Sequence, residues 1–175
     1  TVPHWRATAD GFVMDTAGYQ LAMGRNIGSW LRCTAGGEEM QLRPSVVEAG
    51  DDYNAAVIAK LASEVEGYID PVDPSRLVFE GAFGKGIDLE LVARTDGYGQ
   101  HVIFHGQPNL PRGMELSKSD ISICTELNLD TTHAGDIKIS LDKQEGTDWQ
   151  KEVPAESTLE EIEIYKEGDE EGVKA

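Results

Sequence analysis

Basic residues are scarce in this chain of 175 residues: 15 Lys and Arg stand against 32 Asp and Glu, so the formal net charge is −17. Nucleic-acid affinity depends on Lys and Arg side chains that neutralise phosphates, and docking on anionic lipid depends on them too. Long apolar runs are also missing, because no stretch approaches the roughly 18 consecutive apolar residues of a membrane helix. We therefore expect no nucleic-acid partner and no membrane insertion.

Cysteine is equally rare. Cys33 and Cys124 lie far apart in the chain and form no Cys-x-x-Cys motif, which argues against zinc or thioredoxin-like chemistry. The spacing leaves two interpretations open, a long-range disulfide of an exported protein or two unlinked thiols in apolar positions. Pairing requires Cα atoms within about 7 Å, and spacing alone does not show this.

Motifs of catalytic chemistry are absent as well. His101 and His105 lie four positions apart in an alternating, strand-like segment, where their rings are roughly 13 Å apart and too distant to share a metal ion. Residues 81–86 contain a Gly-Lys pair, but Gly86 follows where a phosphate loop needs Ser or Thr, so we expect a glycine turn. No Gly-x-Ser-x-Gly elbow is present. We expect no catalytic residue and no organic cofactor.

Carboxylates are the one kind of metal ligand that the composition supplies in quantity. Calcium prefers oxygen ligands from Asp, Glu and loop carbonyls. The candidate ligands in glycine- and proline-containing loops are Asp51, Asp52, Asp70 and Asp73. No twelve-residue EF-hand loop is present, so these residues predict at most one structural calcium ion.

Glycine is plentiful, with 19 residues that divide the chain into short segments. Gly36-Gly37 and Asp96-Gly97 are typical of tight turns. Between such turns apolar and polar residues alternate, which is typical of half-buried strands. The alternating segments are residues 87–93, 101–104, 121–124, 137–141 and 161–165. This pattern predicts a mainly β protein, an antiparallel β-sandwich, because the regularly interposed helices of parallel folds are missing.

Two segments depart from this pattern. Residues 54–66 are rich in helix formers, and Val57, Ile58, Leu61 and Val65 share one helical face, so we expect a short helix that ends at Gly67. The Ala and Val content of this segment also permits a strand. The last twenty residues carry eight acidic and two basic side chains. We therefore divide the chain into a β-sandwich domain, residues 1–155, and an acidic terminal strand with a linker or tail, residues 156–175.

The middle of the chain resembles a known family. Residues 28–32, 39–44, 77–89 and 96–104 follow one order, and the most distinctive part is Ala82-Phe83-Gly84-Lys85-Gly86-Ile87-Asp88-Leu89-Glu90-Leu91. Residues 20–112 are similar to a β-rich domain near the start of large exported bacterial surface proteins, including some with Tyr-Asp repeats. The resemblance implies a supersandwich-like β domain, an extracellular or cell-surface location and no transferable catalytic residue. The exported setting also favours a Cys33–Cys124 disulfide. Thr1 in the first position leads us to expect either a processed chain or a segment of a longer one.

Three functions are compatible with these features. The first is a non-enzymatic structural or adhesive domain that presents or assembles with other domains or subunits, for which an unpaired sheet edge is a template. The second is a carbohydrate-binding or carbohydrate-active domain in which Trp5 and Trp149 stack on sugars; Trp30 lies in an alternating segment that predicts a core position. The third is a viral capsid or tail decoration protein.

Overall fold

The structure, a computed structural model, describes residues 1–129, 137–141, 162–166 and 173–174. Strands dominate the described residues and helix is limited to one short segment, which confirms the mainly β prediction. A short 3-10 helix, η1 (Leu116–Lys118), precedes β11. The strands are β1 (Arg6–Ala7), β2 (Gly11–Asp15), β3 (Tyr19–Gly24), β4 (Leu31–Ala35), β5 (Glu38–Gly50), β6 (Ala55–Lys60), β7 (Tyr68–Ile69), β8 (Arg76–Phe79), β9 (Ile87–Ala93), β10 (Tyr98–Phe104), β11 (Asp120–Leu129), β12 (Ile137–Leu141), β13 (Ile162–Lys166) and β14 (Val173–Lys174).

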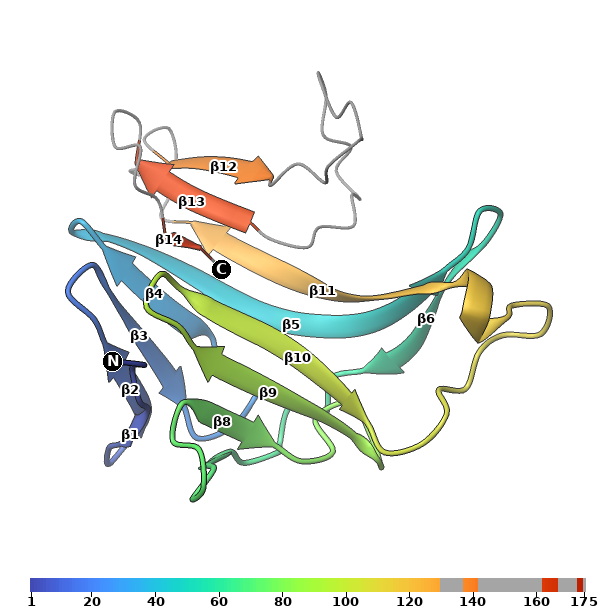
Figure 1. Cartoon of the computed structure of the whole chain (residues 1–175), viewed down its shortest axis with the longest axis horizontal. Helices are drawn as coiled ribbons and strands as arrows, with labels where there is room; N and C mark the ends of the chain where they lie inside the picture. The colour runs from blue at the N-terminus through green and yellow to red at the C-terminus, as the bar shows by residue number, and fades with distance from the viewer. Residues whose placement is uncertain (130–136, 142–161, 167–172, 175) are drawn as a thin grey trace.

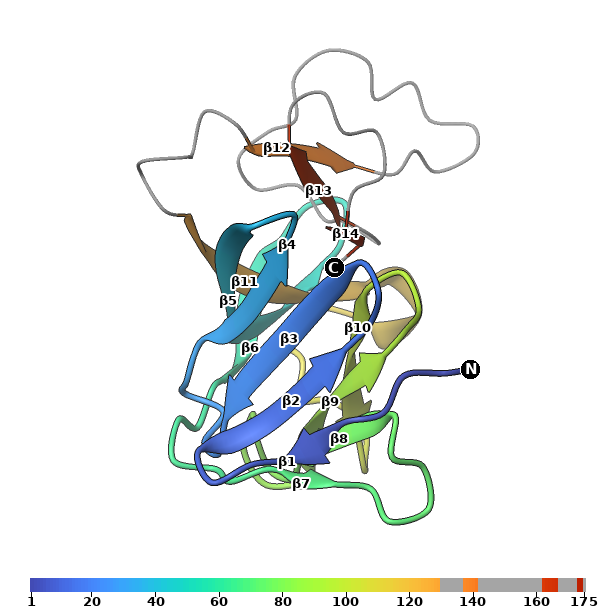
Figure 2. The same ribbon diagram turned by 90° about the vertical axis from the view of Figure 1, so that its left-hand side faces the viewer.

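Two antiparallel sheets pack together as a sandwich, as Figures 1 and 2 show from two sides. The larger sheet has the order β1-β2-β3-β4-β5-β11, and β6 also pairs with β5; the smaller sheet has the order β10-β9-β8-β7. The predicted antiparallel β-sandwich is therefore confirmed. None of the helices in the described ranges is long and apolar enough to cross a membrane.

A third sheet has the order β12-β13-β14. β12 belongs to the predicted domain 1–155 and β13 to the predicted segment 156–175, and the two strands pair in antiparallel register. The predicted boundary itself, between residues 155 and 156, lies outside the described residues.

The core fills the space between the two large sheets. Met14 and Leu21 of the larger sheet and Leu89 of the smaller sheet are fully buried and belong to one apolar cluster. On β9 the alternation predicted from sequence holds, because Leu89 and Leu91 face this cluster while Asp88 and Glu90 lie on the opposite face. Burial of such side chains stabilises the fold by about 1.5–3 kcal/mol each.

Strand β5 changes partners along its length, and its inward face changes with them. Residues 38–42 pair with β4 and residues 46–50 pair with β6. Between them Pro44 lies opposite Thr125 of β11 and Val46 opposite Cys124, so Ser45 is an extra residue on β5. This bulge shifts the alternation by one position: Met40 and Leu42 face inward before it, and Val47 faces inward after it.

The predicted helix over residues 54–66 is wrong. Ala55–Lys60 forms β6, which pairs with the part of β5 that β4 leaves free. The four residues expected on one helical face are separated, since Val57 is 46% exposed while Ile58, Leu61 and Val65 pack against the core. The Ala and Val content of this segment permits a helix or a strand. A strand forms because it can pair with the free edge of β5.

Gly67, which was expected to end the helix, has a different role. It lies against the ring of Phe79, where an added Cβ would be 2.6 Å from the ring atom Cε1. A side chain at this position would collide with a core residue that is fully buried. The predicted turn at Gly36-Gly37 is confirmed: it joins β4 to β5, and both glycines have positive φ.

Candidate functional site

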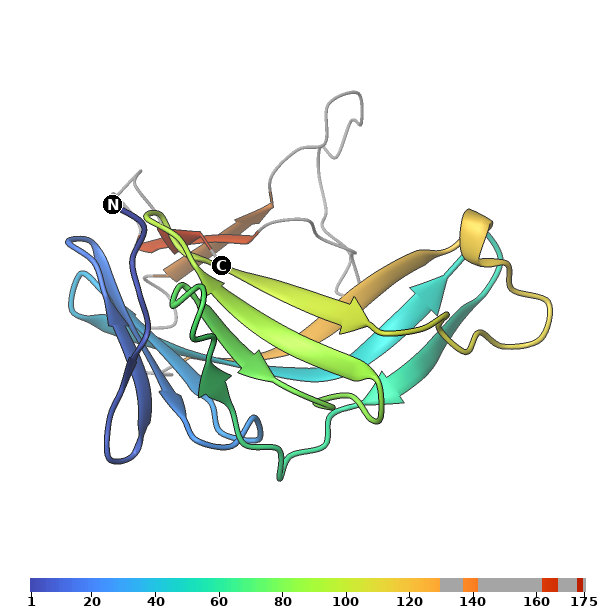
Figure 3. The ribbon, with the colours of Figure 1, turned by 60° about the horizontal axis from the view of Figure 1, so that its bottom comes forward.

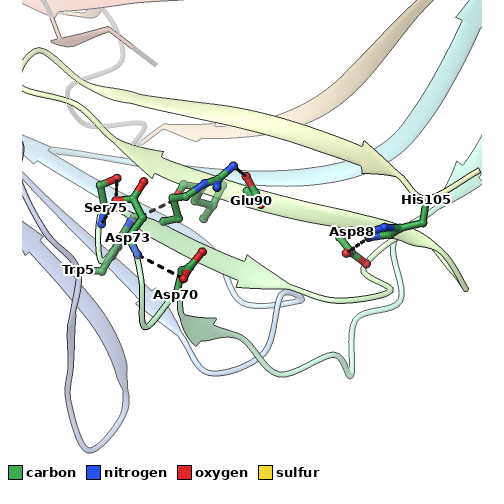
Figure 4. A network of polar contacts seen from close by, with 9 residues as sticks. Trp5, Asp70, Asp73, Ser75, Asp88, Glu90 and His105 are labelled. Atoms are coloured by element: carbon green, nitrogen blue, oxygen red, sulfur yellow. Dashed lines mark hydrogen bonds and ion pairs between the residues drawn. The ribbon is translucent and has the colours of Figure 1, made fainter.

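The predicted calcium ligands lie in two separate loops and hold those loops together. In the β7–β8 loop, Asp70 Oδ1 accepts the N–H groups of Val72, at 2.8 Å, and Asp73, at 3.3 Å. Asp73 Oδ1 accepts the hydroxyl and the N–H of Ser75, at 2.6 and 3.1 Å. The hydroxyl bond is the main cause that lowers the pKa of Asp73. Figure 4 shows these residues beside Trp5.

Asp51 and Asp52 belong instead to the β5–β6 hairpin, which Figure 3 shows at the right-hand end of the molecule. Asp51 Oδ1 accepts the N–H groups of Tyr53 and Asn54, at 2.9 and 2.7 Å, and these bonds lower its pKa. Asp52 is exposed in the same turn. Across the described ranges no group of three or more His, Cys, Asp or Glu side chains is arranged to hold a metal ion. Asp51, like the two β7–β8 carboxylates, thus binds backbone within its own turn.

A second set of polar contacts lies on the outer face of the smaller sheet (Figure 4). Asp88 accepts the N–H of Gly81 at 2.7 Å and lies 2.5 Å from Nε2 of His105. Glu90, two residues along β9, pairs with Arg76 of β8 at 2.7 Å. Asp88 thus joins the β8–β9 turn to the end of β10. The Arg76–Glu90 pair joins β8 to β9.

The structure contradicts the predicted disulfide. Cys33 and Cys124, which both lie in the described part of the chain, are not joined. The sheet register gives the reason, because Cys33 lies opposite Met40 of β5 whereas Cys124 lies opposite Val46. Six residues of strand span about 20 Å, and a disulfide needs Cα atoms within about 7 Å. Burial raises the pKa of the Cys33 thiol to about 11, which makes it a poor nucleophile.

The tryptophans expected to stack on sugars do not form a surface in the described residues. Trp5 is 3% exposed, and its Nε1–H donates to the carbonyl of Leu91 at 3.1 Å, so the prediction that it stacks on a ligand is wrong. Trp149 lies outside the described residues. Trp30, expected in the core, is half-buried, and the guanidinium of Arg43 lies 4.4 Å from its ring centroid.

The sandwich is closed on one side by buried hydrogen bonds between its sheets. The Trp5 indole reaches Leu91 of β9, and the Tyr19 hydroxyl lies against the carbonyl oxygens of Arg94 and Gly97 in the β9–β10 turn, to one of which it donates. Burial raises the pKa of Tyr19 to about 12. We call this region, Trp5 and Tyr19 with the β9–β10 turn, the closed margin.

The other side is held by a weaker contact. Gln100 of β10 and Thr125 of β11 face each other across the two sheets, with side-chain N–O and O–O distances of 3.4 and 3.5 Å. Leu127 continues the inward-facing row of β11, opposite buried Leu42, yet it is 38% exposed. We call this region, the facing edges of β10 and β11, the open margin.

The edge strands of the two sheets differ in how they are protected. β1 and β7 have two residues each, β10 has seven, and β6 has six and ends with exposed Lys60. Shortness and lysine are both common ways to keep an edge from pairing. β11 has ten residues, without Pro, Lys or Arg, and within the described ranges it pairs with β5 alone.

β11 is also regular. Its bulge partner is Ser45 on β5, so β11 itself alternates without interruption. The inward row is Ile121, Ile123, Thr125 and Leu127, and the outward row is Asp120, Ser122, Cys124, Glu126 and Asn128. Ten residues of regular strand, whose side chains alternate without a break, make a suitable template for a further strand.

Sequence reasoning located part of this strand and missed its position at the edge of the sheet. The alternation at residues 121–124 predicted a strand, but it gave no sign that the strand continues to residue 129 or lies at an edge. Two signals were available, the Glu126-Leu127-Asn128-Leu129 alternation and the lack of Lys and Pro. Edge position, however, depends on which strands pair, and this follows from the whole fold.

Comparison with known proteins adds no assignment. The chain matches no family model, no curated protein and no solved structure. The resemblance to exported surface-protein domains therefore stays a prediction.

Proposed function

We propose that this chain is a non-enzymatic structural or adhesive domain of an extracellular or cell-envelope protein, and that it assembles with other modules through the β11 edge. The observation that carries the proposal is the regular, ten-residue edge of β11, which pairs with β5 alone among the strands that the structure describes. In strand addition the main chain of a partner segment supplies hydrogen bonds to such an edge, and alternate side chains supply specificity.

The side chains at the open margin support this mode of binding. Val102 and Phe104 on β10 and Ile121 and Ile123 on β11 are partly buried and pack against the edge of the core. Leu127 leaves 38% of its surface exposed on the inward side of β11. A strand added beside β11 would place its alternate apolar side chains over these residues and remove that area from water.

The polar pairs described above support a structural function. Carboxylates of Asp51, Asp70, Asp73 and Asp88 accept backbone N–H groups of nearby turns. The carbohydrate alternative has less support, because Trp5 is buried and Arg43 stacks on the ring of Trp30. A viral capsid or decoration protein, the third alternative, would use the same edge to assemble.

A neutral strand peptide tests the proposal. The probe is a fluorescein-labelled nine-residue peptide that alternates Val with Thr, used below the concentration at which light scattering detects its self-association. We expect binding in fluorescence anisotropy and expect Leu127→Lys to weaken it at least about tenfold, because an inward-pointing charge protects a sheet edge. Val57→Lys is the matched control, since Val57 is also exposed, at 46%, on another edge strand. Equal binding by both variants, or no binding by the parent chain, would refute strand addition at β11.

A further inference from the structure

We infer that the strand accepted at the β11 edge is a basic one, an extended segment that alternates apolar residues with Lys or Arg. This inference rests on the proposed function and names the partner class of the same edge. It is argued from the two faces of β11, which favour different side chains on a neighbouring strand.

The inward face requires apolar side chains from the partner. Ile121 and Ile123 pack against the core, and Leu127 is opposite buried Leu42 while remaining 38% exposed. A polar side chain placed over this row would lose its water without a hydrogen-bonding partner. Every second residue of the added strand is therefore apolar.

The outward face requires a positive charge. The acidic side chains on this face of β11 are Asp120 and Glu126, and the sequence from 119 to 129 contains no Lys or Arg. On the neighbouring strand, Glu48 lies opposite Ser122 and adds a third acid to the same face. Arg43 lies opposite Glu126 and is bound to it at 2.6 Å while stacking on Trp30. A second cation on this face, Lys60, lies opposite Val46 on the far side of β5 from β11.

Cross-strand neighbours of opposite charge stabilise a sheet, and like charges that lie directly opposite destabilise it. A partner with Lys or Arg at its outward positions would lie beside Asp120 and Glu126, with Glu48 one strand further away, whereas an acidic partner would meet repulsion. A second copy of this chain is the less favourable occupant, because it brings the same carboxylates and a formal net charge of −17 to the interface.

Three strand peptides of equal length separate this inference from the proposed function. They alternate Val with Lys, Thr or Glu and are titrated into the chain by fluorescence anisotropy at low salt. We expect the Lys peptide to bind about fivefold more tightly than the Thr peptide, and the Glu peptide to bind most weakly. The differences should shrink in about 1 M salt, where the Debye length falls to about 3 Å.

Variants locate the charge preference. The double variant Asp120→Asn with Glu126→Gln should bring the Lys peptide close to the Thr peptide while leaving Thr-peptide binding unchanged. Asp15→Asn is the matched control, because Asp15 is a 43% exposed carboxylate on the paired strand β2 of the same sheet. This control should leave the order of the three peptides intact.

The outcomes are distinct. Equal binding of all three peptides, each weakened by Leu127→Lys, overturns the basic-partner inference and leaves strand addition standing. Failure of every peptide, or binding that Leu127→Lys does not change, overturns the proposed function itself. If the chain instead dimerises in sedimentation equilibrium and Leu127→Lys makes it monomeric, the occupant is a second copy and the basic-partner inference is wrong.

Discussion

The two sheets of the sandwich are joined by different contacts at the closed margin and at the open margin. At the closed margin, Trp5 and Tyr19 cross from the larger sheet region to main-chain carbonyls of the smaller sheet and its β9–β10 turn, and both side chains are buried. At the open margin, Gln100 and Thr125 make long contacts between half-buried side chains, and Leu127 remains partly exposed. The closed margin is therefore fully packed, whereas the open margin leaves part of an apolar side chain in contact with water.

The same substitution at the two margins should give the largest contrast. Leu21→Ala removes a fully buried side chain beside the closed margin and should lower the free energy of unfolding by about 2–5 kcal/mol, because it leaves a cavity. Leu127→Ala should lower it by about 1 kcal/mol or less, since this side chain is already 38% exposed. Urea unfolding followed by fluorescence measures both. Similar losses would mean that the open margin is packed as tightly as the core.

Removing one hydroxyl at each margin should give a smaller contrast. Tyr19→Phe removes the buried hydroxyl that donates to the carbonyl of either Arg94 or Gly97 and should destabilise the fold by about 1–3 kcal/mol. Thr125→Val removes contacts of 3.4–3.5 Å to Gln100 and should change stability by about 0.5 kcal/mol. Urea midpoints at constant m-value provide the comparison. A larger loss of stability in Thr125→Val than in Tyr19→Phe would contradict this prediction.

Alkaline pH should lower the stability of the fold through two buried groups, Tyr19 of the closed margin and Cys33 of β4. The folded-state pKa of Tyr19 is raised to about 12, mainly by burial, and that of Cys33 is raised to about 11 for the same reason. The unfolded chain releases these protons at lower pH, so stability is fully present below about pH 8.5 and falls as pH rises from there to about 12. Urea midpoints measured across this range should decline less steeply above pH 10 in Tyr19→Phe. Thr125→Val, which removes a group that does not titrate, should leave the slope unchanged.

Substitutions in surface ion pairs should have the smallest effects on stability. Here the larger loss is expected for the pair beside the open margin. Arg6 and Asp15 form a pair whose side chains are 65% and 43% exposed, so Arg6→Gln should cost about 0.5 kcal/mol or less. Arg43 is 34% exposed, binds Glu126 beside the open margin and also stacks on Trp30, so Arg43→Gln should cost about 1 kcal/mol. Thermal unfolding at low and high salt measures the difference. A larger loss for Arg6→Gln would contradict it.

Much of the local structure was predictable from sequence. The alternation of Leu89 and Leu91 with Asp88 and Glu90 predicted both the strand β9 and the face that it buries. Gly36-Gly37 predicted the turn between β4 and β5. These features depend on side-chain period and backbone sterics, which operate within a few residues.

The errors concern features that depend on distant residues. Residues 55–60 became a strand because β5 offers a free edge beyond the end of β4, which local propensity does not reveal. Trp5 looked like an available aromatic side chain, and its burial follows from docking against β9 and the β7–β8 loop. The cysteine pairing failed because the register along β5 sets their separation.

The sequence by itself determined that this is a β-rich, strongly acidic chain, with 15 Lys and Arg against 32 Asp and Glu, because composition and alternation act residue by residue. Only the tertiary structure decided which strand lies at an edge, which tryptophan is buried and which carboxylates bind turn N–H groups. Those properties depend on strand order and register, which are set by the joint packing of two sheets. The open edge of β11, on which the proposed function rests, is one of them.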